Sequence, residues 1–312
     1  SNCCFVAWKF KGHSRGEELM RLVLGIFPNL EKSSVLNVLR HVVDFCRNNN
    51  IEPILPYGIA EEYACKGYSP EDFSSMQCFT AAMSLGGDGT LLRMTRYAAS
   101  LNIPVFGINF GKLGFLTEVE FPQMEAAILK VRDGDFWVEE RSMLQAIVYD
   151  KNQHEVLCAH ALNDFVLTKG HFSRLARLDV RIAGQKSVVY PSDGVIVATA
   201  TGSTAYSLAA GGPIVYPGLD VSILTPICAH SLETRPLIIP MSDQIEISVM
   251  PPCDEWYLSA DGINIKRITE KEKVVIQKSP LSVQFLHIYP STYYETWQEK
   301  LRRGEETTKF QG

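Results

Sequence analysis

A glycine-rich segment, Gly86-Gly87-Asp88-Gly89-Thr90, follows an apolar stretch and precedes a predicted helix. Glycines let a backbone approach a phosphate closely, and a helix N-terminus offers unpaired N–H groups to it. A carboxylate repels phosphate, so Asp88 needs a different role. Asp88 would accept a proton from an attacking hydroxyl or hold a divalent metal ion. The alternative is a structural turn with Asp88 as the helix N-cap, and the spacing alone leaves both interpretations open.

A polar pair, Asn163-Asp164, interrupts the apolar run from 161 to 167. Neighbouring side chains of a strand face opposite sides, so at least one of the two must be satisfied away from open water. The pair therefore either ends a strand in a turn or recognises a ribose or amide group of a ligand.

Small and hydroxylated residues crowd the segment ATGSTAYSLAAGGP at 200–213. They suit a loop and a short helix pressed against a ligand, and the alternative is a tight helix-packing surface. Lys112 lies in a glycine-interrupted loop, where it either meets a phosphate or is solvated. Asp261 is either a turn aspartate or a second carboxylate of the site.

The elements that must position these residues are of two kinds. Up to Gly134, predicted strands alternate with helices, which is typical of a parallel sheet covered by helices. From Trp137 on, short alternating apolar segments separated by turns predict a β-rich domain. We predict strands over 3–10, 51–55, 78–85, 103–108, 144–149, 155–167, 178–182, 195–199, 244–249 and 273–277, and helices over 33–47, 91–100, 204–211 and 293–302.

The expected organisation is an N-terminal Rossmann-like α/β domain at 1–136 and a C-terminal β-sandwich-like domain at 137–290. A nucleotide site is expected between them, and 291–312 would form a terminal helix and a disordered tail. A chain of 312 residues is longer than one hydrophobic core usually takes, which agrees with two domains.

Composition excludes several classes of protein. A net charge of −5 argues against a nucleic-acid partner. No apolar run approaches the roughly 18 to 20 residues that span a bilayer, and no signal peptide is visible, so we expect no membrane partner. The eight cysteines form no C-x-x-C pair, which favours reduced thiols in a cytoplasmic protein.

Taken in order, these segments resemble the NAD kinase family in its bacterial form. The matching stretches are GGDGTLL, GINFGKLGFLT, ALNDFVL, SDG with the later ATGSTAYSLAAGGPIVYP run, and SADG. GGDGT alone also occurs in lipid kinases, whereas the TGSTAYSLAAGGP run together with LGFLT points to NAD kinases. The resemblance implies transfer of the γ-phosphoryl of ATP, or of inorganic polyphosphate, to the 2′-hydroxyl of the adenosine ribose of NAD. The product would be NADP, and a divalent cation, Mg²⁺, is expected to assist.

The resemblance also implies roles for individual residues. Asp88 is implied as the general base, with Gly89 beside the NAD and Phe115 lining the adenine region. Asp193 is implied to reach a bound NAD, either its own or that of a neighbouring subunit in a homotetramer. The other implied NAD contacts are Asn163, Asp164, Arg174, Thr204, Ala205, Tyr206, Ser207, Leu208 and Ala209.

The sequence departs from the family pattern at four positions. Ala200 replaces a proline, Ala209 a serine, Pro191 a basic or polar residue and Ile263 a glutamine. These changes affect peripheral contacts and leave Asp88 intact. Two alternatives are a lipid kinase of the GGDGT group, which leaves the TGSTAYS run unexplained, and a non-catalytic NAD(P)-binding sensor, which has no use for a base.

Overall fold

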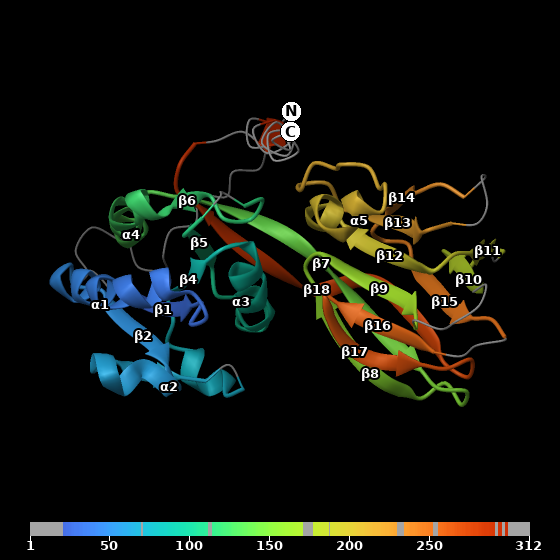
Figure 1. Ribbon diagram of the computed structural model, residues 1–312, viewed down its shortest axis with the longest axis horizontal. Coiled ribbons are helices and arrows are strands. Elements are labelled where there is room, and N and C mark those ends of the chain that lie inside the picture. Colours follow the sequence, from blue (N-terminus) through green and yellow to red (C-terminus); the bar gives the residue numbers. More distant parts are fainter. Residues whose placement is uncertain are drawn as a thin grey trace, which may run out of the picture. The chain divides into compact units, whose positions relative to one another are not determined.

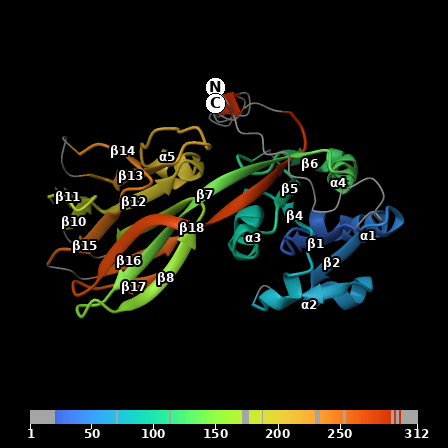
Figure 2. The same ribbon diagram turned by 180° about the vertical axis from the view of Figure 1, so that it is seen from behind.

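The structure is a computed structural model, and it describes residues 21–69, 71–111, 114–170, 177–186, 188–229, 234–251, 255–290, 293–294 and 297–298. Its contacts divide the chain into two compact units (Figures 1 and 2). Unit 1 comprises Ser1–Glu139 and Val283–Gly312, and unit 2 comprises Glu140–Ser282. The chain passes from one unit to the other twice, through the long strands β7 and β18.

Unit 1 is built on a parallel sheet with the strand order β5-β4-β1-β2-β3, and the end of β18 pairs beside β5 at Phe285. The short strand β6 also pairs with β5. The strands are β1 (Val23–Pro28), β2 (Glu52–Pro56), β3 (Lys66–Tyr68), β4 (Ala81–Gly86), β5 (Val105–Asn109) and β6 (Val119–Glu120). The helices are α1 (Ser33–Asn48), α2 (Tyr57–Ala60), η1 (Glu61–Tyr63), η2 (Phe73–Met76), α3 (Asp88–Leu101), η3 (Phe121–Gln123) and α4 (Met124–Asp133).

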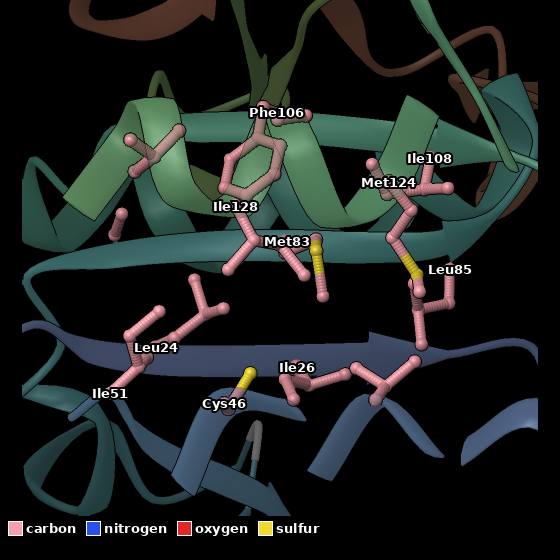
Figure 3. Packing of buried hydrophobic residues seen from close by; sticks show 14 of the residues in the cluster. Leu24, Ile26, Cys46, Ile51, Met83, Leu85, Phe106, Ile108, Met124 and Ile128 are labelled. Atoms are coloured by element: carbon pink, nitrogen blue, oxygen red, sulfur yellow. The ribbon is translucent and has the colours of Figure 1, made fainter. Parts of the chain in front are cut away.

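The core of unit 1 lies between this sheet and its helices (Figure 3). Every residue of β4 is buried, as expected of a parallel strand covered on both faces. Helix α1 buries one stripe at helical spacing, including Val35, Leu39 and Cys46. Met124 and Ile128 of α4 reach the same cluster. The predicted α/β fold of the N-terminal half is thus confirmed.

The sequence analysis did not predict β1, which is central to the sheet. Its sequence VLGIFP contains glycine and proline, both rare inside strands, and this hides the pattern. Gly25 is needed there because the ring of Phe79 occupies the space that a Cβ would fill. The predicted strand at 3–10 lies outside the described residues.

Unit 2 consists of two sheets that pack face to face. One has the order β11-β10-β15-β18-β7-β8 and the other β14-β13-β12-β9-β16-β17. The strands are β7 (Trp137–Tyr149), β8 (Glu155–Ala161), β9 (Asp164–Lys169), β10 (Arg177–Ile182), β11 (Val188–Pro191), β12 (Gly194–Thr199), β13 (Val221–Ile227), β14 (Leu237–Pro240), β15 (Ile245–Val249), β16 (Trp256–Ala260), β17 (Ile263–Ile268) and β18 (Lys273–His287). Their inner faces share one hydrophobic core, which confirms the predicted β-sandwich.

A short helical segment covers the outer face of the second sheet. It comprises η4 (Thr201–Thr204) and α5 (Tyr206–Ala209). Along β12, Val195 and Val197 enter the sandwich core, whereas Ile196 and Ala198 pack outward in a cluster with Val215. Strand β12 is therefore buried on both faces, and its outer face holds the hydroxyl-rich segment in place.

Two expectations about boundaries differ from the structure. The run 155–167 is not one strand: β8 and β9 are separated at 162–163 and belong to different sheets. The end of β18, which the sequence analysis assigned to the second domain, lies in unit 1 because Phe285 pairs with Val105. The predicted helix at 293–302 lies mostly outside the described residues, and no helix in the described part of the chain is long and apolar enough to cross a membrane.

Candidate functional site

Asp88 is the first residue of α3, and its carboxylate binds a neighbouring loop. Oδ2 accepts hydrogen bonds from the backbone N–H of Phe115 (2.5 Å) and of Leu116 (3.2 Å). Oδ1 accepts from the N–H (3.0 Å) and the hydroxyl (2.8 Å) of Thr117. Gly87 occupies the N-cap position of α3, so Asp88 is not the N-cap residue. Its carboxylate binds the loop at 115–117 and not the end of its own helix.

The loop is shaped to receive this carboxylate. Asn109, at the end of β5, donates from Nδ2 to the Thr117 hydroxyl (3.1 Å) and accepts at Oδ1 from the N–H of Gly111 (2.9 Å). A Cβ at Gly114 would overlap the Asp88 carboxylate itself. Thus β4, β5 and the start of α3 bring Asp88 and this loop together at the carboxyl edge of a parallel sheet, where α/β proteins bind ligands.

The remaining predicted residues of unit 1 lie around this point. Gly89 is exposed, and outside its chain neighbours and the backbone of its own helix turn no atom of the described residues lies within 4 Å of where its Cβ would be. Phe115 is half-buried beside Asp88, to which its backbone is bonded. Lys112 lies outside the described residues.

In unit 2, a second aspartate cluster shapes the turn between β8 and β9. The carboxylate of Asp261 accepts from the backbone N–H groups of Leu162 (3.1 Å), Asn163 (2.8 Å) and Asp164 (3.3 Å). Asp261 has a φ of 47°, which Asp tolerates better than most residues. It is therefore a turn aspartate, and its charge also faces the buried carboxyl group of Asp164.

Asp164 is buried, with 4% of its surface exposed. Burial first, and the negative charge of Asp261 second, raise the pKa of Asp164 to about 7. Near neutral pH a substantial fraction of Asp164 is therefore protonated, and a protonated carboxyl group donates a hydrogen bond as well as accepting one.

Asn163 is fixed through its backbone. Its carbonyl accepts from the N–H of Thr199 (2.8 Å), and the hydroxyl of Thr199 donates to the carbonyl of Leu162 (2.6 Å). A Cβ at Gly202 would overlap the same Asn163 carbonyl. The motif glycine at 202 thus lets the hydroxyl-rich segment approach the Asn163 turn, and the Asn163 side chain stays partly exposed.

Part of the hydroxyl-rich segment packs internally, as the packing interpretation expects, and part of it stays exposed. Ser203 is buried and bonds the backbone of Val215, and Ser207 is buried with its hydroxyl 2.9 Å from that of Thr225. The Ser207 hydroxyl ties the segment to β13, and the Ser203 hydroxyl ties it to the loop that follows the segment. For Ser207, whose side chain was predicted to wrap the nucleotide, the structure shows an internal packing role. The predicted residues that remain wholly or partly exposed are Thr204, Ala205, Tyr206, Leu208 and Ala209.

Asp193 directly precedes β12, and one of its carboxylate oxygens is 2.7 Å from Nζ of Lys169. Its side chain is about one-third exposed, so it remains accessible to a ligand or a second chain. Arg174 lies outside the described residues.

Among the described residues no group of three or more His, Cys, Asp or Glu side chains converges. The carboxylate of Asp88 already accepts four hydrogen bonds. The described residues therefore do not form a complete protein cage for a cation.

Sequence reasoning missed three residues that build these clusters: Gly114, Thr117 and Thr199. Thr117 lies in the LGFLT stretch, and its place after a glycine loop was a usable signal. Thr199 is the last residue of a buried strand, and nothing in the sequence distinguishes it from any other strand residue. Only the three-dimensional pairing shows that it anchors the Asn163 turn.

A carboxylate at a glycine-rich strand-to-helix turn, on the carboxyl edge of a parallel sheet, agrees with the phosphoryl transfer expected from the motifs. Residues 25–136 match the family model for the ATP-NAD kinase N-terminal domain, and residues 162–288 match that for the C-terminal domain. The chain therefore belongs to the ATP-NAD kinase family, in agreement with the resemblance found in its motifs.

Relatives agree with this assignment over most of the chain. The NAD kinase of Moorella thermoacetica is 38% identical over 283 residues, which cover 90% of this chain and 89% of that one. The NAD kinase of Carboxydothermus hydrogenoformans is 42% identical over 218 residues, 70% of this chain and 78% of that one.

Solved structures show the same fold. Yeast NADH kinase complexed with NADH superposes with a TM-score of 0.80 at 25% identity, covering 90% of this chain and 87% of that one. An NAD kinase from Archaeoglobus fulgidus in complex with ATP has a TM-score of 0.69 at 24% identity, with 90% and 99% covered.

Proposed function

We propose that this chain is an NAD kinase, which transfers the γ-phosphoryl of ATP to the 2′-hydroxyl of the adenosine ribose of NAD and releases NADP and ADP. The observation that carries this proposal is the match of both halves of the chain to ATP-NAD kinase domains. A lipid kinase of the GGDGT group would not account for the match of the C-terminal domain.

Asp88 is proposed as the general base. In the transfer, the 2′-hydroxyl oxygen bonds to the γ-phosphorus, its proton passes to the Asp88 carboxylate, and the bond to the β–γ bridging oxygen breaks. The carboxylate accepts four hydrogen bonds, so a substrate hydroxyl must displace one donor. The Thr117 hydroxyl is the donor that can yield, because it is the only one of the four on a side chain.

The divalent ion is proposed to enter with ATP. Mg²⁺ is usually held by one or two carboxylates together with substrate phosphates, and not by an all-protein cage. The absence of a three-ligand cluster among the described residues agrees with a metal–ATP complex as the substrate. Polyphosphate, a chain of phosphates that also binds Mg²⁺, remains a second candidate donor.

Unit 2 is proposed to contribute contacts to NAD. The Asn163 turn and the exposed part of 204–209 offer amide, carboxyl, backbone and aromatic groups, which suit a ribose and its phosphates. Asp164, protonated in part near neutral pH, would donate a hydrogen bond to a ribose hydroxyl or a phosphate oxygen without repelling it.

A homotetramer is proposed as the working form. Two edge strands of unit 2 carry exposed apolar side chains: Val188 and Val189 on β11, and Leu237 and Ile238 on β14. Unpaired edges of this kind favour association with another chain. Asp193 would then reach the NAD of a neighbour.

The cytoplasm is proposed as the location of the chain. This reducing compartment suits the five described cysteines, all of which are free thiols.

The experiment incubates the purified chain with NAD, ATP and Mg²⁺ and detects NADP with an NADP-specific dehydrogenase. NADP formation that requires ATP, or another triphosphate or polyphosphate, supports the proposal. Tight NAD binding with no NADP from any donor would instead indicate the non-catalytic sensor.

A further inference from the structure

A buried histidine lies between two glutamates in unit 1. The Nδ1 atom of His287, at the end of β18, is 2.6 Å from a carboxylate oxygen of Glu118, and Nε2 is 2.6 Å from one of Glu139. His287 is 8% exposed, and the indole of Trp137 stacks on its ring at a centroid distance of 5.4 Å. Since each ring nitrogen faces a carboxylate, both nitrogens donate only when the imidazole is protonated.

The charges around His287 favour that protonated form. Burial alone would lower the pKa of the imidazole. The hydrogen bonds to Glu118 and Glu139, together with their negative charges, outweigh burial and raise the pKa of His287 to about 9. The groups that face the ring are Glu118 next to β6, Glu139 on β7 and the uncharged Trp137.

Glu118 directly follows the residue that binds Asp88. Thr117 donates both its N–H and its hydroxyl to Asp88, and Val119 pairs with Ile108 of β5. The second carboxylate oxygen of Glu118 is buried and has no hydrogen-bond partner within the described part of the chain. Among the described residues, the bond to His287 is therefore the one hydrogen bond that holds the Glu118 side chain.

We propose that His287 is a positioning residue for Asp88, a role that rests on the proposed function. The imidazolium holds Glu118 and Glu139 on its two sides and thereby fixes the segment from which Thr117 reaches Asp88. Without that positive charge, two partly buried carboxylates repel each other across the vacated space. Glu118 then shifts, Thr117 moves with it, and the Asp88 carboxylate loses its orientation toward the substrate hydroxyl.

The first test is hydrogen exchange of the backbone amides at 115–117, which donate to Asp88. We expect faster exchange in His287→Gln than in the natural chain. The matched control is His41→Gln, which breaks another His–Glu pair of unit 1: His41 Nε2 is 2.6 Å from Glu125, and both side chains are largely exposed. Exchange at 115–117 in the control should equal that of the natural chain.

The second test is kinetic. His287→Gln should lower kcat by about 10- to 100-fold while the KM values for NAD and ATP stay unchanged, because the reacting geometry is lost and not the binding. In the natural chain kcat should fall as the pH rises through about 9, and His287→Gln should lack this fall. Adding Glu139→Gln to His287→Gln removes the repulsion and should restore part of kcat.

If His287→Gln does not fold, the single variant Glu139→Gln carries the test. It retains the His287–Glu118 pair but removes one charge, so the high-pH fall of kcat should move to lower pH. Unchanged exchange at 115–117 and an unchanged pH profile in the folded variant would overturn the proposal. That outcome leaves the proposed function standing, since the function fails only if the natural chain forms no NADP.

Discussion

At the scale of single residues, the chemistry centres on what surrounds Asp88. A general base needs an accessible lone pair, but the carboxylate of Asp88 already accepts hydrogen bonds from four donors of one loop. These donors orient the carboxylate before the substrate binds. Only the Thr117 hydroxyl can rotate away without a change in the backbone conformation of the loop. Substitutions near Asp88 therefore affect the order of the loop as well as the chemistry.

Gly89 permits a clean test of nucleotide contact. A Cβ there meets none of the described residues outside its own helix turn, so Gly89→Ala should fold normally and gain up to about 1 kcal/mol from helix propensity. If NAD lies against Gly89, the added methyl group collides with it, and KM for NAD rises. Steady-state kinetics and thermal denaturation measure both effects.

Gly58, in α2, is the matched control because its Cβ would also meet open space. Gly58→Ala should leave KM for NAD unchanged. An equal KM in Gly89→Ala and in the natural chain would refute the predicted contact at Gly89.

At the scale of elements, the loop after β5 is moulded around a side chain from α3. Gly114→Ala places a Cβ where the Asp88 carboxylate lies, so the loop and the carboxylate must separate. We expect kcat to fall by about 100-fold, as for other small misplacements of reacting groups. Gly111→Ala is the control, since the nearest atom to its Cβ among the described residues, apart from its chain neighbours, is Asn109 Oδ1 at 3.8 Å, an ordinary contact. Equal kcat values for the two variants would show that the loop does not position Asp88.

The turn between β8 and β9 predicts an unusual pH dependence of stability. The pKa of Asp164 is raised from 3.8 to about 7 in the folded chain. Below about pH 4 both states are protonated; above it the unfolded state releases the proton first, so folding is increasingly disfavoured up to about pH 7. Asp164→Asn should therefore stabilise the chain more at about pH 8 than at about pH 4, by on the order of a few kcal/mol.

Urea unfolding at the two pH values measures this difference. The control is Asp193→Asn, because Asp193 is partly exposed and paired with Lys169. A gain from Asp164→Asn that is the same at both pH values would contradict the raised pKa. KM for NAD should also rise in Asp164→Asn if this carboxyl group contacts the nucleotide.

At the scale of the whole molecule, the α/β fold and the β-sandwich could be predicted from the sequence, but not every strand and strand boundary within them. Periodicity located α1 and β4 because each buries a regular stripe or an entire strand. Periodicity missed β1, where the ring of Phe79 packs against Gly25. It also predicted β8 and β9 as one strand, although Thr199 and Asp261, from distant parts of the chain, hold a turn between them. Such tertiary contacts leave no local pattern.

The same limit applies to the candidate site. The motif residues Asp88, Asn163 and Asp261 stood out by type and spacing, but which groups pair with one another did not. Thr117 lies 29 residues from Asp88 along the chain, and Asp261 lies 98 residues from Asn163. Which groups orient a motif residue is decided by the topology of the sheet and not by the motif.

Association of chains is also a property of the whole molecule. Leu237→Lys and Ile238→Lys together place charges on the exposed edge strand β14 and should dissociate the proposed tetramer, as light scattering would show. If Asp193 serves a neighbour's site, activity per chain should fall with dissociation, and Asp193→Ala in the intact tetramer should raise KM for NAD. A monomer with full activity would contradict this.

The most direct test compares NADP formation by the natural chain with that by Asp88→Asn, at saturating NAD, ATP and Mg²⁺. We predict that the natural chain forms NADP and that kcat of Asp88→Asn falls by about 10²- to 10⁴-fold, as loss of a general base produces. Because the new amide would also point a donor at the donors of the loop, the melting temperature should fall as well. A folded Asp88→Asn variant that keeps more than about one-tenth of the natural kcat would contradict the assignment of Asp88 as the base.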